Sequence, residues 1–245
     1  MADSTNPSPD PYQRLLRQYE EIAELSGSLA HEIKNPLSVI VLNMDVMAED
    51  LADPQTPHER RALEKAKIVQ SQCVRLQNLL DDFIRFARLR DLELLAGNFN
   101  ELITRVLDFF EPQAKQNNIE IIRYLDPDLP SVKLNSQTMY AALMNLVKNA
   151  FESMEKGGQL VIRSRVARKG IALDLIDTGC GMGRKTLMHM FDAFYSTKES
   201  GSGLGLPMVR RIIEAHGGLI DVKSEVDRGT QFTIELPVPA RIEEK

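Results

Sequence analysis

The sequence predicts an α + α/β chain: an antiparallel helical hairpin that dimerises into a four-helix bundle, followed by an α/β sandwich domain. Two observations lead to this fold class. Apolar residues follow helical periods over roughly the first 90 positions, and helical and strand patterns alternate after Gly97. The chain has 245 residues, 43% hydrophobic and 27% charged, which suits an ordered globular protein with a sizeable core.

Charge and cysteine content narrow the possible partners and the cellular location of the protein. A formal net charge of −5 argues against nucleic acid as the main partner, because phosphate binding needs a basic face. No apolar run is long enough for a transmembrane segment and no secretory signal is visible, so we expect a cytoplasmic protein. Cys73 and Cys180 lie far apart and are interpreted as reduced thiols.

The first helix is expected from Tyr12 to Leu51. Residues 1–11 are polar and contain three prolines, so they are interpreted as a flexible N-terminus. Apolar positions then recur with a 3.6-residue period. Pro36 lies inside this pattern and predicts a kink near Asn35, because proline removes a backbone donor. The turn residues and prolines of positions 52–57 end the helix.

A second helix is expected up to about Arg90. Its apolar residues advance by alternating steps of three and four, which is typical of a coiled-coil seam. The seam consists of Ala66, Val69, Cys73, Leu76, Leu80, Phe83 and Ala87. Two helices joined by a short loop form an antiparallel hairpin with too little core to stand alone. We therefore expect a homodimer in which two hairpins bury their stripes as a four-helix bundle.

The second domain is expected over residues 97–240, with 241–245 as a C-terminal tail. Its final helix is expected to begin near Pro207, which suits a first turn, and to end before Gly217, which suits the position after a last turn. The expected helices cover residues 101–117, 137–154 and about 207–216, and the expected strands cover 120–124, 159–166, 171–176, 219–224 and 230–236.

His31 is the first candidate for chemistry. At 100° per residue it lies about 200° from Leu29, so it points away from the apolar stripe. Asn35 returns to within about 40° of the His31 face, and Glu32 is adjacent in sequence. An imidazole and an amide together in solvent favour a reactive site, although a lone histidine is more often a simple surface residue.

Three elements of the second domain stand out. Asn145 and Asn149 share one helix face, Asp177 follows a strand directly, and glycines of residues 201–206 lead into a helix. Backbone N–H groups at such a helix start bind phosphate oxygens, and an amide oxygen suits Mg²⁺. Each element alone is weak evidence for a nucleotide site. The asparagines could instead contact neighbouring helices, Asp177 could be a turn residue, and the glycines could form a mobile loop.

Five ordered motifs resemble those of one family. LAHEIKNPL is similar to the phosphoacceptor box of sensor histidine kinases. NLVKNA, DTGCGM, FDAFYSTK and GSGLGLPMVRRIIEAHGG resemble the nucleotide-binding boxes of the same family. The likeness spans about residues 20–237, and FYSTK followed by GSGLGL most resembles the nitrogen-regulation branch. It implies a dimerisation and histidine-phosphotransfer domain over 12–96 and a gyrase-like, Bergerat-type ATP-binding domain over 97–240.

The resemblance implies a mechanism at the first motif. His31 takes the γ-phosphate of ATP, using the lone pair of an imidazole that is largely neutral at pH 7. Glu32 holds the other ring nitrogen and accepts its proton. The phosphoryl group then passes to an aspartate of a response regulator receiver domain. Asn35, four residues after the histidine, implies a phosphatase role toward that regulator.

The resemblance also implies an ATP and Mg²⁺ site. Asn149 would hold Mg²⁺ with Asn145 nearby, and Asp177 would bind the adenine amine. The other implied contacts are Gly179, Gly181 and Thr230 at the base, and Gly201, Gly203, Leu204, Gly205 and Leu206 at the phosphates. Residues 188–204 are expected to form a lid. Many relatives carry a basic residue at the position of Glu152, so Lys148 or Lys198 is the candidate γ-phosphate contact here.

Two other functional classes remain open at this point. A gyrase-type conformational ATPase needs a glutamate where this chain has Asn145, so its water would lack a general base. A non-catalytic nucleotide-binding scaffold is less favoured, because the motif residues needed for chemistry are present. Cys180, within DTGCGM, would lie close to the nucleotide if it is not simply a packing residue.

Overall fold

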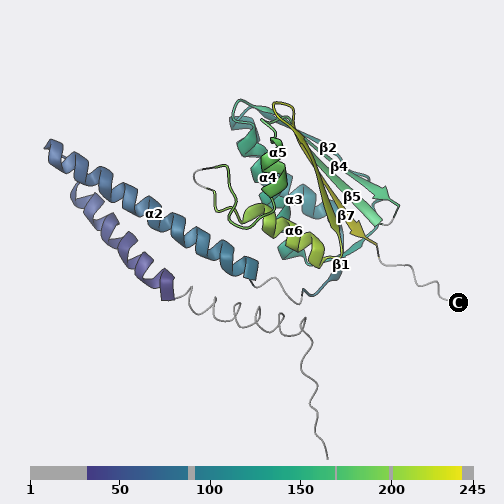
Figure 1. Cartoon of the computed structure of the whole chain (residues 1–245), viewed down its shortest axis with the longest axis horizontal. Coiled ribbons are helices and arrows are strands. Elements are labelled where there is room, and N and C mark those ends of the chain that lie inside the picture. Colours follow the sequence, from purple (N-terminus) through teal and green to yellow (C-terminus); the bar gives the residue numbers. More distant parts are fainter. Residues whose placement is uncertain (1–31, 88–91, 169, 199–200, 239–245) are drawn as a thin grey trace, which may run out of the picture. The chain divides into compact units, whose positions relative to one another are not determined.

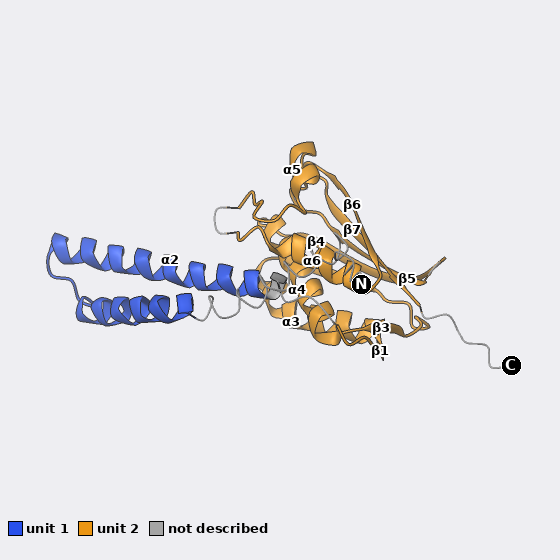
Figure 2. Ribbon diagram, turned by 60° about the horizontal axis from the view of Figure 1, so that its bottom comes forward, with its two compact units in different colours: residues 1–88 blue, residues 89–245 orange. Residues whose placement is uncertain are grey.

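The computed structural model describes residues 32–87, 92–168, 170–198 and 201–238. The chain divides into two compact units, one through Arg88 and one from Leu89 onward (Figure 2). His31 and the rest of the predicted helical stretch before it lie outside the described residues. No helix among the described residues has both the length and the apolar character needed to cross a membrane.

The first unit contains an antiparallel helical hairpin, as the sequence predicts. A helix over residues 32–50 is followed by a short loop and by α2, Pro57–Ala87 (Figure 1). Hydrogen-bonded pairs of polar side chains join the two helices. As the residue number rises along the first helix, the number of its partner falls by the same amount along α2, as expected for antiparallel helices. These pairs are Lys34 with Asp81, Ser38 with Gln77 and Asp45 with Gln70.

The loop ends in a reciprocal cap. Thr56 Oγ1 accepts from the Glu59 backbone N–H at 3.2 Å, and the Glu59 carboxylate accepts from the Thr56 N–H at 3.1 Å. The same carboxylate accepts from the Gln55 N–H at 2.7 Å, and this bond is the main cause of the lowered pKa of Glu59. These bonds fix the start of α2. The kink expected near Asn35 stays a prediction, because the helix before residue 32 lies outside the described residues.

The predicted seam of α2 is only half buried within one chain. Ala66 and Cys73, seven residues apart, are 3% and 6% exposed. Val69 and Leu76, which alternate with them, are 41% and 50% exposed. A single hairpin therefore covers one side of the seam and leaves the other side as an apolar surface.

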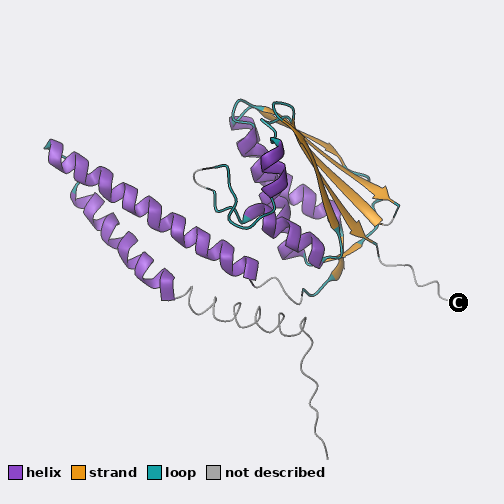
Figure 3. Ribbon diagram, viewed as in Figure 1, coloured by secondary structure: helices purple, strands orange, loops and turns teal. Residues whose placement is uncertain are grey.

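The second unit is a five-stranded sheet with helices on one face (Figure 3). The strand order is β2-β4-β5-β7-β6; β2 and β4 are parallel, and the other neighbours are antiparallel. The strands are β2 Ile119–Tyr124, β4 Gly158–Ala167, β5 Gly170–Asp177, β6 Leu219–Glu225 and β7 Gly229–Pro237. The main helices are α3 Phe99–Gln116, α4 Ser136–Ser153 and α6 Gly205–Ala215.

The core lies between the helices and the sheet. Met139 and Leu146 of α4 are fully buried, and Phe151 packs its ring against Phe110 of α3 at 5.0 Å between centroids. Ile171 and Leu173 of β5 are equally buried. The central helix and the central strand therefore supply the middle of the core, which explains their strongly apolar sequences.

Three short elements were not predicted: β1 Leu95–Gly97, β3 Val132–Leu134 and α5 Arg184–His189. β1 and β3 pair as a separate antiparallel ribbon, too short to show a sequence alternation. β1 lies across the expected domain boundary at residues 96 and 97 and belongs to the second unit. The last helix begins at Gly205 rather than near Pro207, so Pro207 occupies the first turn.

Candidate nucleotide-binding site

Asp177 ends β5 and is only 3% exposed. Its Oδ1 atom accepts from the Gly179 N–H at 2.9 Å, the Thr230 N–H at 3.2 Å and the Ser153 hydroxyl at 3.3 Å. Burial raises the pKa of Asp177, and these three hydrogen bonds oppose that rise only in part. Oδ2 has no hydrogen-bond partner among the described residues, so this atom can accept from a ligand.

The glycines around Asp177 are required by the backbone. A Cβ on Gly179 would lie 2.0 Å from the Ser153 hydroxyl. Gly181 has φ +63°, and a Cβ there would lie 2.0 Å from the Glu225 carbonyl oxygen. A Cβ on Gly229 would lie 2.0 Å from the carbonyl oxygen of Asp177 itself. Close backbone packing alone accounts for glycine at these positions.

Thr230 lies opposite Asp177 in the β5–β7 ladder and is 6% exposed. Its hydroxyl lies 2.9 Å from the Ser224 hydroxyl, which also accepts from the Met182 N–H at 2.8 Å. Ser224 therefore ties the end of the DTGCGM motif to two neighbouring strands. Ser224 was not predicted as a site residue, and no motif in this sequence marks it.

Three polar residues of α4, Asn145, Asn149 and Ser153, recur in steps of four and so share one face of the helix. Ser153 is the one that contacts Asp177 in the described part of the chain. The Asn145 amide donates to the Ala141 carbonyl at 3.1 Å, and a Cβ on Gly205 would lie 3.4 Å from its Oδ1. Asn149 is half-buried and makes no side-chain hydrogen bond within the described parts of the chain. Ser153 was missed, although its spacing from the asparagine pair is a usable signal.

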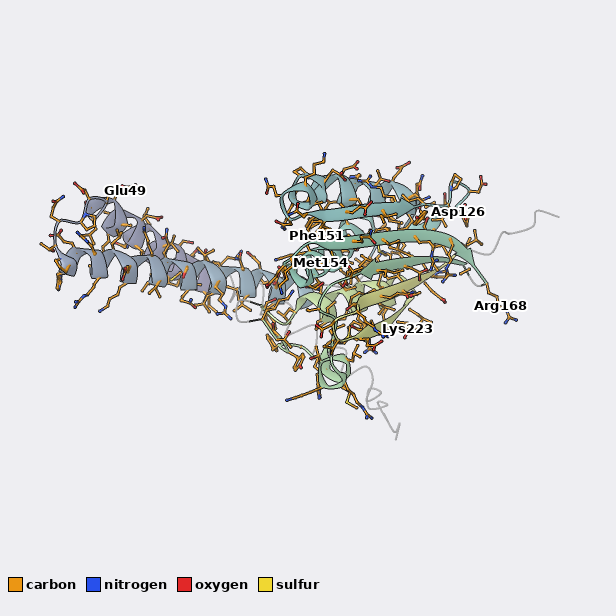
Figure 4. The ribbon with its side chains drawn as sticks, turned by 90° about the horizontal axis from the view of Figure 1, so that it is seen from above. Glu49, Asp126, Phe151, Met154, Arg168 and Lys223 are labelled. Carbon is orange, nitrogen blue, oxygen red and sulfur yellow. The ribbon has the colours of Figure 1, made fainter. Side chains whose placement is uncertain are left out.

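Phe151 and Met154 mark the end of α4 beside these residues (Figure 4). Met154 is 2% exposed, and its sulfur accepts from the Thr178 hydroxyl at 3.8 Å. Thr178 in turn accepts from the Gln159 N–H at 2.9 Å. Thr178, the residue after Asp177, thus contacts the buried C-terminal end of α4 through Met154.

The two candidate phosphate-binding lysines meet at a single carboxylate. Lys198 is ion-paired with Glu152 in the last turn of α4, and Lys148 lies 3.8 Å from the same carboxylate. Both lysine side chains are substantially exposed. The structure thus groups the two predicted lysines, together with the acidic residue that departs from the family pattern.

The glycine-rich segment leads into α6. Leu204 is the residue before the helix, and no side chain in the described part of the chain caps the first N–H groups of α6. Gly203 has φ +67° and accepts at its carbonyl from the Phe194 N–H at 3.0 Å. A Cβ on Gly203 would lie 2.4 Å from the Phe194 backbone, so glycine is needed there. Gly201 donates its N–H to the Lys198 carbonyl at 3.2 Å.

The residues predicted to act in phosphoryl transfer belong to the first unit. Glu32 and Asn35 are exposed on the helix over residues 32–50. His31, the predicted phosphoacceptor, lies outside the described residues, so its shared face with Asn35 stays a prediction. The described residues contain no group of three or more histidine, cysteine or acidic side chains placed to hold a metal.

The sheet with its helical layer and the polar corner at Asp177 define a class of nucleotide-binding ATPase domains. Residues 135–240 match the family described as histidine kinase-, DNA gyrase B- and HSP90-like ATPases. Residues 21–92 match the His Kinase A phospho-acceptor domain. The chain belongs to the histidine kinase family and carries its catalytic core, a phospho-acceptor hairpin followed by an ATPase domain.

Individual relatives agree. Sensor histidine kinase ZraS of Salmonella typhi is 30% identical over 244 residues, covering 94% of this chain and 51% of ZraS. Full-length ShkA in complex with AMPPNP is 28% identical, with a TM-score of 0.70, covering 87% of this chain and 45% of ShkA.

Histidine kinase ThkA is similar in two structures. Its catalytic domain is 32% identical with a TM-score of 0.54, covering 59% of this chain and 95% of that domain. Its complex with response regulator protein TrrA is 26% identical with a TM-score of 0.66, covering 96% of this chain and 68% of that chain. The chain spans about half the length of the curated relative ZraS.

Proposed function

We propose that this chain is the catalytic core of a two-component sensor histidine kinase. It autophosphorylates His31 from Mg-ATP and passes the phosphoryl group to an aspartate of a response regulator. The observation that supports this most strongly is Asp177 in a domain of the histidine kinase family: it is buried, its Oδ1 accepts three hydrogen bonds, and its Oδ2 has no partner among the described residues. Residues 12–96 then form the dimerisation and phosphotransfer domain, and residues 97–240 the ATP-binding domain.

The nucleotide-binding roles follow from the free polar atoms. Asp177 Oδ2 accepts from the adenine amine, and Thr230, Gly179 and Gly181 shape the corner in which the base lies. Asn149, whose side-chain amide has no hydrogen-bond partner among the described residues, supplies a hard oxygen ligand for Mg²⁺, with Asn145 beside it on the nucleotide. When bound, Mg²⁺ neutralises part of the triphosphate charge. The start of α6, which no described side chain caps, suits phosphate oxygens, together with Gly201, Gly203, Leu204, Gly205 and Leu206.

Phosphoryl transfer uses two residues of the hairpin. A ring nitrogen of His31 forms a bond to the γ-phosphorus as the bond from phosphorus to the bridging oxygen of ADP breaks. The other ring nitrogen loses its proton to Glu32, so the phosphorylated imidazole carries no extra charge. Glu32 is exposed and makes no hydrogen bond within the described part of the hairpin, which leaves its carboxylate available.

Asn35 supports a second, reverse activity. We infer that its exposed amide orients a water molecule for hydrolysis of the regulator's phosphoaspartate, which makes the protein a phosphatase as well as a kinase. Asn35→Ala should lower dephosphorylation of a phosphorylated regulator far more than autophosphorylation. Asn43→Ala, an exposed asparagine on the same helix, is the matched control and should change neither. Equal loss of both activities in Asn35→Ala contradicts the assignment.

Two partners are part of the proposal. The exposed half of the α2 seam, including Val69 and Leu76, suits a second copy of the hairpin, as a homodimeric four-helix bundle requires. The receiver domain of a response regulator is the second partner; ThkA, a similar protein, forms a complex with a response regulator. The FYSTK and GSGLGL motifs favour the nitrogen-regulation branch, and we propose a cytoplasmic location for these domains.

Incubation with γ-labelled ATP and Mg²⁺ tests the proposal. A histidine kinase yields a phosphoprotein that is labile in acid and stable in alkali. Release of labelled phosphate without protein labelling would instead indicate a gyrase-type ATPase. Nucleotide binding without either reaction would indicate a non-catalytic scaffold.

A further inference from the structure

Glu152 occupies an unusual position for an acidic residue in this domain. It lies three residues after Asn149 in the last turn of α4, so the two side chains share a helix face. Its carboxylate is 39% exposed and is paired with Lys198 and, at 3.8 Å, with Lys148. A negative charge therefore lies beside the amide that we assign to Mg²⁺ and the triphosphate.

The two lysines come from different parts of the domain. Lys148 is one turn before Glu152 on α4, whereas Lys198 follows α4 by more than forty residues and reaches back to it. Lys198 is 42% exposed at its side chain, so this ion pair is partly solvated. Exposed pairs of this kind contribute at most about 1 kcal/mol, and another anion can replace either partner.

We propose that Glu152 competes with the terminal phosphate of ATP to be the counterion of Lys198. In the nucleotide-free chain the Glu152 carboxylate occupies Lys198, and the γ-phosphate must replace it as the partner of that lysine. ADP lacks the γ-phosphate and leaves the ion pair in place. Glu152 therefore lowers the affinity for ATP while leaving the affinity for ADP nearly unchanged. This inference rests on the proposed ATP-binding function and identifies a residue that sets its selectivity.

Removing the charge of Glu152 tests the inference. Glu152→Gln keeps the shape of an exposed side chain and should bind a non-hydrolysable ATP analogue about two- to fivefold more tightly, measured by calorimetric titration with Mg²⁺. The dissociation constant of ADP should change less. Glu155→Gln is the matched control: it removes one charge from an exposed residue three positions later that has no ion pair among the described residues.

Two further measurements isolate the role of Lys198. In a Lys198→Gln background, Glu152→Gln should give a smaller gain in affinity for the ATP analogue, because the main competed cation is gone and only Lys148, 3.8 Å from the Glu152 carboxylate, remains of the pair. Without nucleotide, trypsin should cleave after Lys198 faster in Glu152→Gln than in Glu155→Gln, because the lysine has lost its partner.

The outcomes separate the inference from the proposed function. If the wild-type chain binds neither nucleotide, the proposed ATP site is wrong and the inference falls with it. If the wild-type chain binds both nucleotides and Glu152→Gln binds the ATP analogue no more tightly, the inference alone is overturned. A gain of equal size for ATP analogue and ADP also overturns it, since the terminal phosphate would then not be the competing group.

Discussion

The Nε2 atom of His216 accepts a hydrogen bond of 2.9 Å from the backbone N–H of Asn135. His216 follows the last turn of α6, and Asn135 caps the start of α4. The Nδ1 atom lies 2.7 Å from the Ile212 carbonyl oxygen, which assigns the single ring proton to Nδ1. A neutral imidazole thus joins the ends of the two helices that flank the proposed nucleotide site.

This contact predicts acid sensitivity of the second unit. Burial lowers the pKa of His216 below that of an unfolded histidine, about 6.5. The contribution of the neutral ring is therefore fully present above the unfolded pKa and is lost as pH falls through the folded pKa. His216→Gln should cost about 1–2 kcal/mol of unfolding free energy at pH 7.5.

The pH dependence distinguishes titration of His216 from simple loss of packing. Between pH 7.5 and pH 5, the wild-type chain should lose more unfolding free energy than His216→Gln in denaturant titrations. His189→Gln, which removes an exposed histidine that pairs with Asp192, serves as the control for loss of a histidine elsewhere in this unit. Parallel slopes for wild type and His216→Gln would contradict the assignment.

Asp177 predicts an opposition between stability and binding. Because its folded pKa is raised above its unfolded value, its contribution to stability is present at low pH and is lost as pH rises through the folded pKa. The ionised carboxylate is therefore a cost at pH 7 without nucleotide. Asp177→Asn keeps an acceptor at Oδ1 and should raise the melting temperature of the nucleotide-free chain.

The same variant should lose nucleotide binding. The new amide presents a donor where the adenine amine needs an acceptor, so affinity for an ATP analogue should fall at least about tenfold. Asp221→Asn, an exposed change on β6, should alter neither the melting temperature nor the affinity. A lower melting temperature for Asp177→Asn would show that the ionised carboxylate is stabilising.

Asp174 is a second buried acid of β5, with the opposite environment. Burial raises its pKa, but hydrogen bonds from Thr233 and Arg163 and the positive charges of Arg165 and Arg163 together outweigh that effect, and the pKa is lowered overall. Its Oδ1 accepts from Thr233 at 2.9 Å, and Oδ2 from Arg163 at 2.9 Å. Asp174→Ala leaves these donors unpaired and should cost about 1–3 kcal/mol in chemical denaturation. Glu235→Ala, exposed on β7, should cost less than about 0.5 kcal/mol; equal costs would contradict a special role for Asp174.

Gly229 predicts a backbone requirement close to the site. Its φ is +100°, and an added Cβ would lie 2.0 Å from the Asp177 carbonyl oxygen. Gly229→Ala should cost at least about 1–3 kcal/mol of unfolding free energy and weaken binding of an ATP analogue. Gly183→Ala provides the contrast, because the nearest described atom to its Cβ would belong to Val226, at 3.9 Å. Similar behaviour of the two variants would show that the corner tolerates a side chain.

Much of this architecture could be predicted from periodicity and punctuation. The apolar stripe of α2 predicts the hairpin, and the strands around Asp177 follow from alternation and turn residues. β1 and α5 were missed because they are only three and six residues long. Segments this short do not show a recognisable strand or helix periodicity in the sequence. The half-buried seam was also not predictable, because which of its members face the partner helix depends on the register of the hairpin.

The site was only partly predictable for a different reason. The motif residues Asp177 and Thr230 lie together, because they are directly opposite each other where β5 pairs with β7. Ser153 and Ser224 act through contacts between elements distant in sequence, and serine is too common to mark such a role. The sequence flagged Glu152 as a departure from the family, but only the fold brings Lys198 to it.

The most direct test of the central claim uses γ-labelled ATP with two histidine variants. His31→Gln removes the proposed phosphoacceptor, and His58→Gln removes an exposed histidine at the start of α2 in the same hairpin. We expect acid-labile label on the wild-type chain and on His58→Gln, and none on His31→Gln that still binds the ATP analogue. Undiminished acid-labile label on His31→Gln would contradict the account.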